Sequence, residues 1–239
     1  MSSLSVLIAC RRALGLPLQF SNRLSRVHCT TCPGRPEIDE EGYHLSVCKA
    51  HGAATHLHNC MNGEVLKMHG EVNKYASLEV GGLFPNDNPR PDGVVRAGST
   101  VLIIDTSVRT PLKADLVARA AASEGYAASA GEADKDRIYD VPCKQFGYDF
   151  LPAVFESFGA IGHRLAGHIQ HLENEYLNLH VEEAFGGCTF TPRWRERFSV
   201  ALQNGMASKI IGHCNRLHIP LSLSPFDSAF PPVSSSAGC

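Results

Sequence analysis

Long apolar runs and early acidic residues are both scarce in this sequence of 239 residues. No stretch approaches the roughly 18 consecutive apolar residues that a membrane-spanning helix needs, so we expect no membrane partner. The apolar start from Leu4 to Cys10 is too short for such a helix, and its arginines follow the apolar residues, the wrong order for a secretory signal. These absences favour a nuclear or cytoplasmic location. An acid-free N-terminus with arginines and serines also fits a mitochondrial transit peptide, which stays a minor alternative.

Net charge is also low, at −2, which argues against a protein that coats nucleic acid by net charge alone. Basic residues are nevertheless concentrated in two segments, one before the first acidic residue, Glu37, and one late in the chain. We expect DNA affinity to reside in these segments, because contacts to phosphates supply most non-specific binding. Their basic residues are Arg11, Arg12, Arg23, Arg26 and Arg35, and then Arg193, Arg195, Arg197, Lys209 and Arg216.

Cysteines number nine and do not form an evenly spread disulfide framework, so we expect a reducing compartment. Cys29 and Cys32 have the spacing that lets one turn point two thiolates at one ion, and His44 and Cys48 lie one helical turn apart. These four residues predict a structural zinc site. The fourth ligand stays open, because other histidines lie nearby, namely His28, His51, His56 and His58. Without zinc, the same residues would be free buried thiols and a surface histidine.

An α/β fold is predicted, with a small mixed sheet and flanking helices. The 44% of hydrophobic residues can bury a core, and the sequence contains both apolar positions at helical spacing and short β-branched runs typical of strands. We expect strands over 93–97, 100–108 and 150–155. Helices are expected over 4–16, 56–78, 111–130, 161–179 and 192–217, with a further helix containing Lys135 and Tyr139. The predicted units are an N-terminal helix and connector (1–27), a zinc-binding module (28–55), a catalytic core (56–185), a helical extension (186–220) and a disordered tail (221–239).

Two aspartates, Asp92 and Asp105, each adjoin a short β-branched run, and the two runs form the arms of a predicted hairpin. Carboxylates on neighbouring strands make a hard oxygen site for Mg²⁺, which suits phosphodiester cleavage. The Thr106 carbonyl could add a backbone ligand and Glu79 a third carboxylate. A cation should stand near the attacking water, and the candidate is Lys135, with Tyr139 one helical turn further on. The alternative is structural: Pro-Asp is a common turn, and two acidic neighbours of Lys135 suit a solvated helix face.

A series of motifs in this order resembles the C-terminal region of non-LTR retrotransposon polyproteins, which holds a zinc knuckle and a restriction-like endonuclease of the PD-(D/E)xK superfamily. The similarity extends from about Leu14 to Leu217. The matching motifs are Cys29-x2-Cys32, Gly42-Tyr43-His44-x3-Cys48, His58-Asn59, Glu79, Arg90-Pro91-Asp92, Asp105, Lys135-x3-Tyr139 and Phe155-Glu156-Ser157-Phe158-Gly159-Ala160.

The resemblance implies nicking of target DNA, after which the exposed 3′ end primes reverse transcription. It implies that Asp92 and Asp105 are the metal aspartates, Glu79 the acidic helix residue and Lys135 a displaced catalytic lysine. The chain departs from the pattern in two places, because Leu57 stands where the family often has arginine and Ser107 stands where the superfamily has its lysine. No Tyr-x-Asp-Asp motif occurs, so the reverse transcriptase domains of a parent polyprotein are missing.

Three hypotheses follow. The first is a Mg²⁺-dependent DNA endonuclease with a zinc module, whose partners are target DNA and possible element RNA. The second is a decayed or co-opted module that keeps zinc and DNA contacts without cleavage, which Ser107 favours. The third, a mitochondrial matrix protein with a structural zinc, depends on the N-terminus alone.

Overall fold

The computed structural model describes residues 2–18, 20, 27–48, 52–78, 80–85, 88–180 and 189–222. Its helices are α1 (Ser3–Ala13), α2 (Tyr43–Val47), α3 (Ala53–Gly70), α4 (Val117–Ala122), α5 (Tyr126–Phe146), α6 (His163–Leu179) and α8 (Phe190–Arg216). Its strands are β1 (Tyr75–Leu78), β2 (Gly93–Ala97), β3 (Thr100–Arg109) and β4 (Asp149–Glu156). Among the described residues, no helix is both long and apolar enough to span a membrane.

The four strands form one mixed sheet in the order β1-β2-β3-β4. The first three strands are antiparallel neighbours, whereas β3 and β4 are parallel. A parallel pair needs a crossover connection, and α4 with α5 provides it. The predicted α/β class with a small mixed sheet and flanking helices is therefore confirmed at this coarse level.

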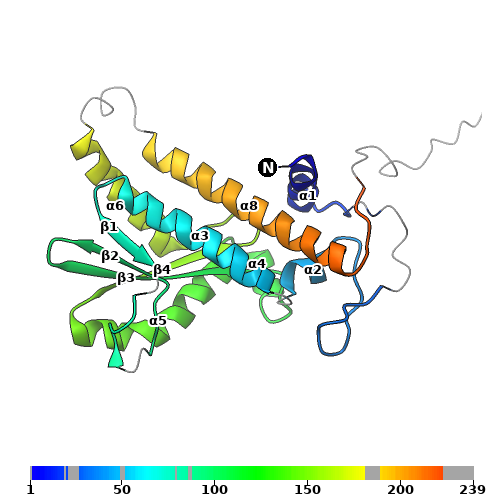
Figure 1. The fold of residues 1–239 in the computed structure, drawn as a ribbon, viewed down its shortest axis with the longest axis horizontal. Coiled ribbons are helices and arrows are strands. Elements are labelled where there is room, and N and C mark those ends of the chain that lie inside the picture. The colour runs from blue at the N-terminus through cyan, green and yellow to red at the C-terminus, as the bar shows by residue number, and fades with distance from the viewer. Residues whose placement is uncertain are drawn as a thin grey trace, which may run out of the picture.

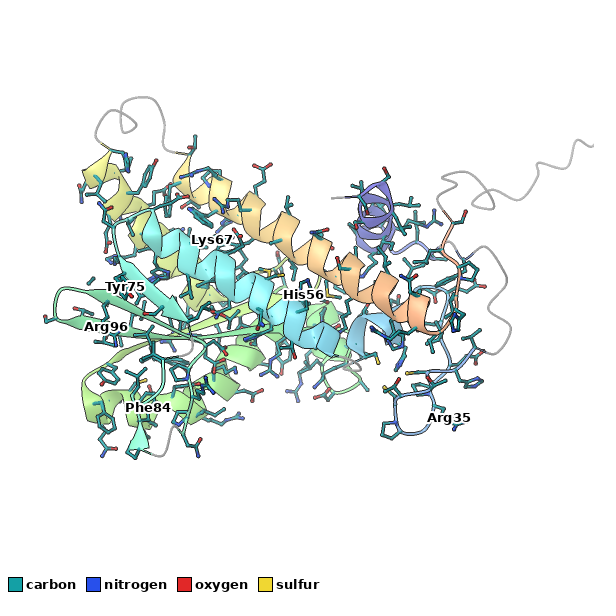
Figure 2. The ribbon with its side chains drawn as sticks, viewed as in Figure 1. Arg35, His56, Lys67, Tyr75, Phe84 and Arg96 are labelled. Atoms are coloured by element: carbon teal, nitrogen blue, oxygen red, sulfur yellow. The ribbon has the colours of Figure 1, made fainter. Side chains whose placement is uncertain are left out.

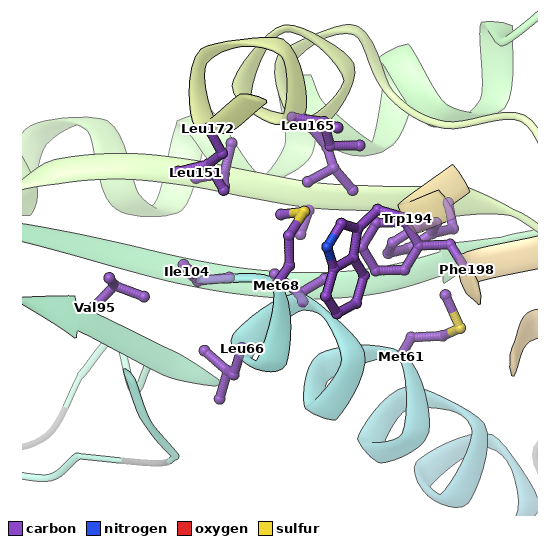
Figure 3. Close-up of a cluster of buried hydrophobic side chains, with 14 of the residues drawn as sticks. Met61, Leu66, Met68, Val95, Ile104, Leu151, Leu165, Leu172, Trp194 and Phe198 are labelled. Atoms are coloured by element: carbon purple, nitrogen blue, oxygen red, sulfur yellow. The ribbon is translucent and has the colours of Figure 1, made fainter. Parts of the chain in front are cut away.

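Helices cover both faces of the sheet, with α5 on one side and α3, α6 and α8 on the other (Figure 1). The larger core lies on the second side, where the aromatic rings of Trp194 and Phe198 from α8 meet Met61 and Met68 from α3 (Figure 3). Leucines of α6 and the inward residues of β2, β3 and β4 complete this core. The late helix, expected as an extension, thus contributes to the main core.

A smaller apolar cluster joins the N-terminal segments to the far half of α8. It contains Ile8 of α1, Leu45 of α2 and Ile210 of α8, together with Cys29 and Cys48. Figure 2 shows Arg35, in the loop of this N-terminal part, at the end of the molecule opposite to Arg96 of the β2–β3 hairpin. The cysteine-containing segment is therefore anchored on α8 rather than on the sheet.

Two predicted helices differ from the structure. The helix expected over 56–78 ends at Gly70, and the last residues of the predicted range, Tyr75–Leu78, form the edge strand β1. Asn73 adopts a left-handed conformation (φ 57°), which asparagine tolerates and which ends the helical path. The helix expected over 111–130 is divided, because Gly125 (φ 71°) separates α4 from α5. Most of the predicted tail, residues 223–239, lies outside the described residues.

Candidate functional site

Both predicted metal aspartates lie where β2 begins beside β3. The Asp92 N–H donates to the Ile104 carbonyl oxygen (3.1 Å), and the Thr106 N–H donates to Asp92 Oδ2 (2.8 Å). The antiparallel register that pairs Gly93 with Ile104 therefore fixes the Asp92 carboxylate next to Asp105. The side chain of Asp105 is 8% exposed and that of Asp92 is 24% exposed.

The two carboxyl groups have opposite electrostatic environments. Burial, followed by the charge of Asp92, raises the pKa of Asp105. Burial also acts to raise the pKa of Asp92, but hydrogen bonds from His58, Thr106 and Asp105 lower it below its ordinary value. Asp105 therefore holds a proton more readily than Asp92. Such a pair of mutually repelling oxygen ligands suits a hard divalent cation.

The helix α5 brings Lys135 to this pair. Lys135 Nζ lies 2.5 Å from Asp105 Oδ1, and the lysine side chain is 19% exposed. Its acidic neighbours in sequence contact arginines instead: Asp134 lies near Arg109 (3.3 Å), and Asp136 is paired with Arg164. The geometry therefore places Lys135 at the aspartates and not on a solvated helix face.

Tyr139 supports the segment before β2. Its hydroxyl donates to the Arg90 carbonyl oxygen (2.9 Å), and its ring stacks on Phe150 with centroids 4.7 Å apart. Burial, followed by the charge of Asp105, raises the pKa of Tyr139. Buried, neutral Tyr139 therefore holds the segment that carries Asp92 through this hydrogen bond to Arg90. Glu79, the predicted third carboxylate, lies outside the described residues.

Two residues of α3 belong to the site and were not assigned to it from the sequence. His58 Nε2 lies 3.1 Å from Asp92 Oδ1, and this partner is the main cause of the raised pKa of His58. Asn62 Nδ2 donates to the Asp92 carbonyl oxygen (2.9 Å), while Asn62 Oδ1 accepts from the Thr106 hydroxyl (2.9 Å). His58 had been an alternative zinc ligand, whereas the structure pairs it with Asp92. The sequence did contain a signal for this role, because the four-residue spacing of His58 and Asn62 puts their side chains on one face of a helix.

A cavity of about 460 Å³ contains this group. Asp92, Asp105, Lys135 and His58 line one part of it, and the remainder extends along the end of β3 towards α8. The space is large enough for a phosphodiester group beside the carboxylates.

Cysteine and histidine side chains form a second group near the C-terminal end of α8. The ligand atoms of Cys29, His44, Cys48 and His213 all lie within 4.8 Å of one another. Three of these were predicted. The fourth position differs, because His213 joins the group in place of Cys32, although Cys32 Sγ remains 3.5 Å from Cys48 Sγ.

The distances fit zinc. Tetrahedral zinc places two sulfurs about 3.8 Å apart, and a sulfur and a nitrogen about 3.5 Å apart. Cys29 Sγ lies 4.0 Å from Cys48 Sγ and 3.6 Å from His213 Nε2. His44 Nε2 is buried and has no hydrogen-bond partner among the described residues, as expected of a nitrogen that faces a metal.

The thiols differ in acidity. Burial acts to raise the pKa of Cys29, but hydrogen bonds, first of all that from the Thr31 backbone, lower it to about 5. The hydrogen bond with Cys48, followed by burial, raises the pKa of Cys32 to about 12. Five possible zinc ligands, the four residues of the group and Cys32, therefore compete for the four coordination positions of a tetrahedral ion. In the described part of the chain, His28, His56 and His58 stand outside the group, and His51 is not described.

Several arginines that are expected from the sequence to bind DNA form hydrogen bonds or ion pairs with other residues of the chain. Arg12 is 7% exposed, donates to the Ser157 carbonyl oxygen (3.5 Å), and has its pKa lowered by burial to about 10. Two arginines of α8 form ion pairs with glutamates at α3, namely Arg193 with Glu71 and Arg197 with Glu64. Arg195 and Arg216 are exposed, whereas Arg23 and Arg26 lie outside the described residues.

Compared with protein-family models and with curated proteins, the chain matches none. The functional argument therefore depends on the residues and their geometry.

Proposed function

We propose that this chain is a Mg²⁺-dependent DNA endonuclease module with a structural zinc site. The observation that carries the proposal is the convergence of Asp92, Asp105 and Lys135 in one cavity. The strand-helix-strand crossover from β3 through α5 to β4 supports it, because the parallel pair fixes α5, and with it Lys135, beside Asp105. The resemblance to retrotransposon endonucleases then implies the substrate, target DNA that is nicked before integration.

Each residue has a separate part in this chemistry. Asp92 and Asp105 would hold a divalent cation, which supplies Lewis-acid activation of phosphate and water when it is bound. Lys135 stabilises the negative charge that develops on the phosphate oxygens as the bond breaks. His58 and the Thr106 N–H orient the Asp92 carboxylate, and Tyr139 holds the preceding segment.

The zinc site would have a structural role. Cys29, His44, Cys48 and His213 are the leading ligand set, with Cys32 as the competing fifth donor. A closed site of this kind contributes folding energy and would bind the N-terminal segments to α8. We further propose that the endonuclease module acts in the nucleus or cytoplasm and that a separate protein supplies the reverse transcriptase.

Plasmid nicking tests the proposal. Zinc-loaded protein should convert supercoiled plasmid to open circles with Mg²⁺, and Asp92→Asn and Asp105→Asn should abolish this activity. The matched control is Asp140→Asn, because Asp140 is a 53% exposed carboxylate on α5 that pairs with Lys144. Equal activity of all three variants would refute the assignment.

A second candidate is the decayed module that binds DNA without cutting it. Ser107, which stands in the place of the superfamily lysine, favours this alternative. Binding of plasmid with no Mg²⁺-dependent nicking by the zinc-loaded wild-type chain would select it.

A further inference from the structure

The cavity at the aspartates continues along the end of β3 and reaches the turn after β4. Ser107, Arg109, Lys113 and Ser157 line this continuation. Ser107 follows Asp105 by two residues, so both side chains project from the same face of β3. The Ser157 N–H donates to the Arg109 carbonyl oxygen (2.8 Å), which holds the turn after β4 beside the end of β3. The cavity therefore has an acidic end and a second end of different chemistry.

Two hydroxyl groups at the second end are buried without a hydrogen bond to any described residue. They are the Oγ atoms of Ser107 and Ser157, and Ser157 as a whole is only 2% exposed. Serine hydroxyls rotate to suit an acceptor, and buried polar groups in folded proteins are almost always paired. Two unpaired donors on residues that line one cavity point to a ligand with acceptor oxygens.

Charge at this end favours an anion. Lys113 is exposed at the cavity and forms no ion pair with any described residue. Lys209 reaches the wall from α8 and donates to the Ser46 carbonyl oxygen (2.6 Å). Among the described residues, the only acids that line the cavity are the two aspartates at the other end. A positive region next to a cation site fits successive phosphates of one strand.

We propose that Ser107, Ser157 and Lys113 form a subsite for the phosphate next to the one that is cleaved. This inference depends on the proposed function, because it takes the aspartate pair as the site of the scissile phosphate. Along β3, Ser107 lies about 7 Å from Asp105, a step comparable to that from one phosphate to the next in a nucleic-acid strand. The ligand is thus a single strand with at least two consecutive phosphodiesters.

Short oligonucleotides test the subsite without knowledge of the target sequence. Zinc-loaded protein with Ca²⁺ is titrated with a thymidine dinucleotide, which has one phosphodiester, and a trinucleotide, which has two. The second phosphodiester should improve the affinity of the wild-type chain about tenfold. A trinucleotide whose second phosphodiester is an uncharged methylphosphonate should bind like the dinucleotide.

Two variants should remove most of the gain in affinity from the second phosphodiester. One is Lys113→Gln, and the other is the double variant Ser107→Ala with Ser157→Ala. Lys113 is exposed and the serine hydroxyls are unpaired, so these variants should fold, and circular dichroism checks this. Lys67→Gln is the control, because Lys67 is an exposed lysine on α3 that pairs with Glu64 (Figure 2). It should keep the full gain.

Several outcomes would overturn the subsite. They are equal affinity of the wild-type chain for the two oligonucleotides, an undiminished gain in the variants, no measurable oligonucleotide binding, or inorganic phosphate binding as tightly as the trinucleotide. If the gain is found but plasmid is not nicked, the subsite stands and the proposed cleavage fails, so the two failures are distinguishable.

Discussion

Lys135 is flanked in sequence by Asp134 and Asp136, yet it contacts Asp105 of β3. Successive residues of a helix point in different directions, so its two neighbours face arginines while Lys135 faces the sheet. The same contact also opposes the burial that raises the pKa of Asp105. A lysine held at a carboxylate in this way is positioned before any substrate arrives, which is the condition for electrostatic stabilisation of a transition state.

Lys135→Ala should lower the single-turnover rate of plasmid nicking by about a hundredfold or more, because it removes a charge that acts mainly in the transition state. The affinity for DNA should change by less than about threefold. Lys144→Ala removes an exposed lysine of the same helix and should leave both quantities unchanged. A loss of affinity that equals the loss of rate would show that Lys135 serves binding alone.

Buried His69 and half-buried His168 form a second polar pair, between α3 and α6. Their Nε2 atoms lie 2.8 Å apart, and His69 Nδ1 bonds to the Val65 carbonyl oxygen (2.8 Å). His69 therefore donates through Nδ1 and accepts at Nε2 from the Nε2–H of His168. Burial lowers the pKa of His69 to about 4 and that of His168 to about 3.

Stability should therefore fall in acid. Above pH 6.5 both rings are neutral in the folded and unfolded states. As the pH falls from 6.5 to about 4, the unfolded chain binds protons that folded His69 cannot accept, which costs on the order of 1–3 kcal/mol. Urea unfolding at several pH values measures this. His168→Gln keeps a neutral donor and should reduce the decline, whereas His180→Gln, at the end of α6, should not.

At the scale of elements, the β2–β3 hairpin and the long helices follow from local patterns, and the edge strand does not. Apolar residues continue at helical spacing through Val72 and Ala76, but the chain leaves the helix at Gly70 and turns at Asn73. Ala76 then pairs with Val95. A short strand of this kind is stabilised by a partner about twenty residues away, which a local pattern cannot reveal.

The packing of α8 on α3 should tolerate little change at Trp194. This residue is fully buried, and its Nε1 donates to Glu71 Oε2 (3.0 Å). Trp194→Ala should lower the free energy of unfolding by about 3–5 kcal/mol, because it leaves a large cavity and an unpaired glutamate oxygen. Trp194→Phe should cost less, and Arg195→Ala, on the exposed side of α8, almost nothing. Denaturant midpoints compare them, and equal midpoints for Trp194→Ala and the wild-type chain would contradict the core assignment.

At the scale of the whole molecule, α8 connects the sheet to the cysteine-containing segment. Spacing alone identifies Cys29, His44 and Cys48, since these residues are close in sequence. His213 lies 165 residues after Cys48 in the sequence, and only the folded chain brings its ring to the thiols. The same limit applies to His58, whose pairing with Asp92 depends on how α3 lies against the hairpin. Local spacing predicts which chemistry is present, and the tertiary fold decides which residues complete it.

Zinc content should distinguish the two possible ligand sets. The purified chain should contain one equivalent of zinc, and His213→Ala should lose it and lower the melting temperature, because α8 is then released from the cysteine-containing segment. Cys32→Ser should retain zinc if His213 is the fourth ligand. The reverse result, with zinc lost in Cys32→Ser and kept in His213→Ala, would restore the ligand set expected from the sequence.

Binding of Mn²⁺, a spectroscopic substitute for Mg²⁺, tests most directly whether Asp92 and Asp105 form one divalent-cation site. Zinc-loaded protein is titrated with Mn²⁺ while electron paramagnetic resonance measures the free ion. The wild-type chain and Asp140→Asn should each bind one equivalent, and Asp92→Asn and Asp105→Asn should bind at least tenfold more weakly, because each removes one of two anionic ligands. Undiminished Mn²⁺ binding in both aspartate variants would contradict the central claim that these carboxylates form the metal site.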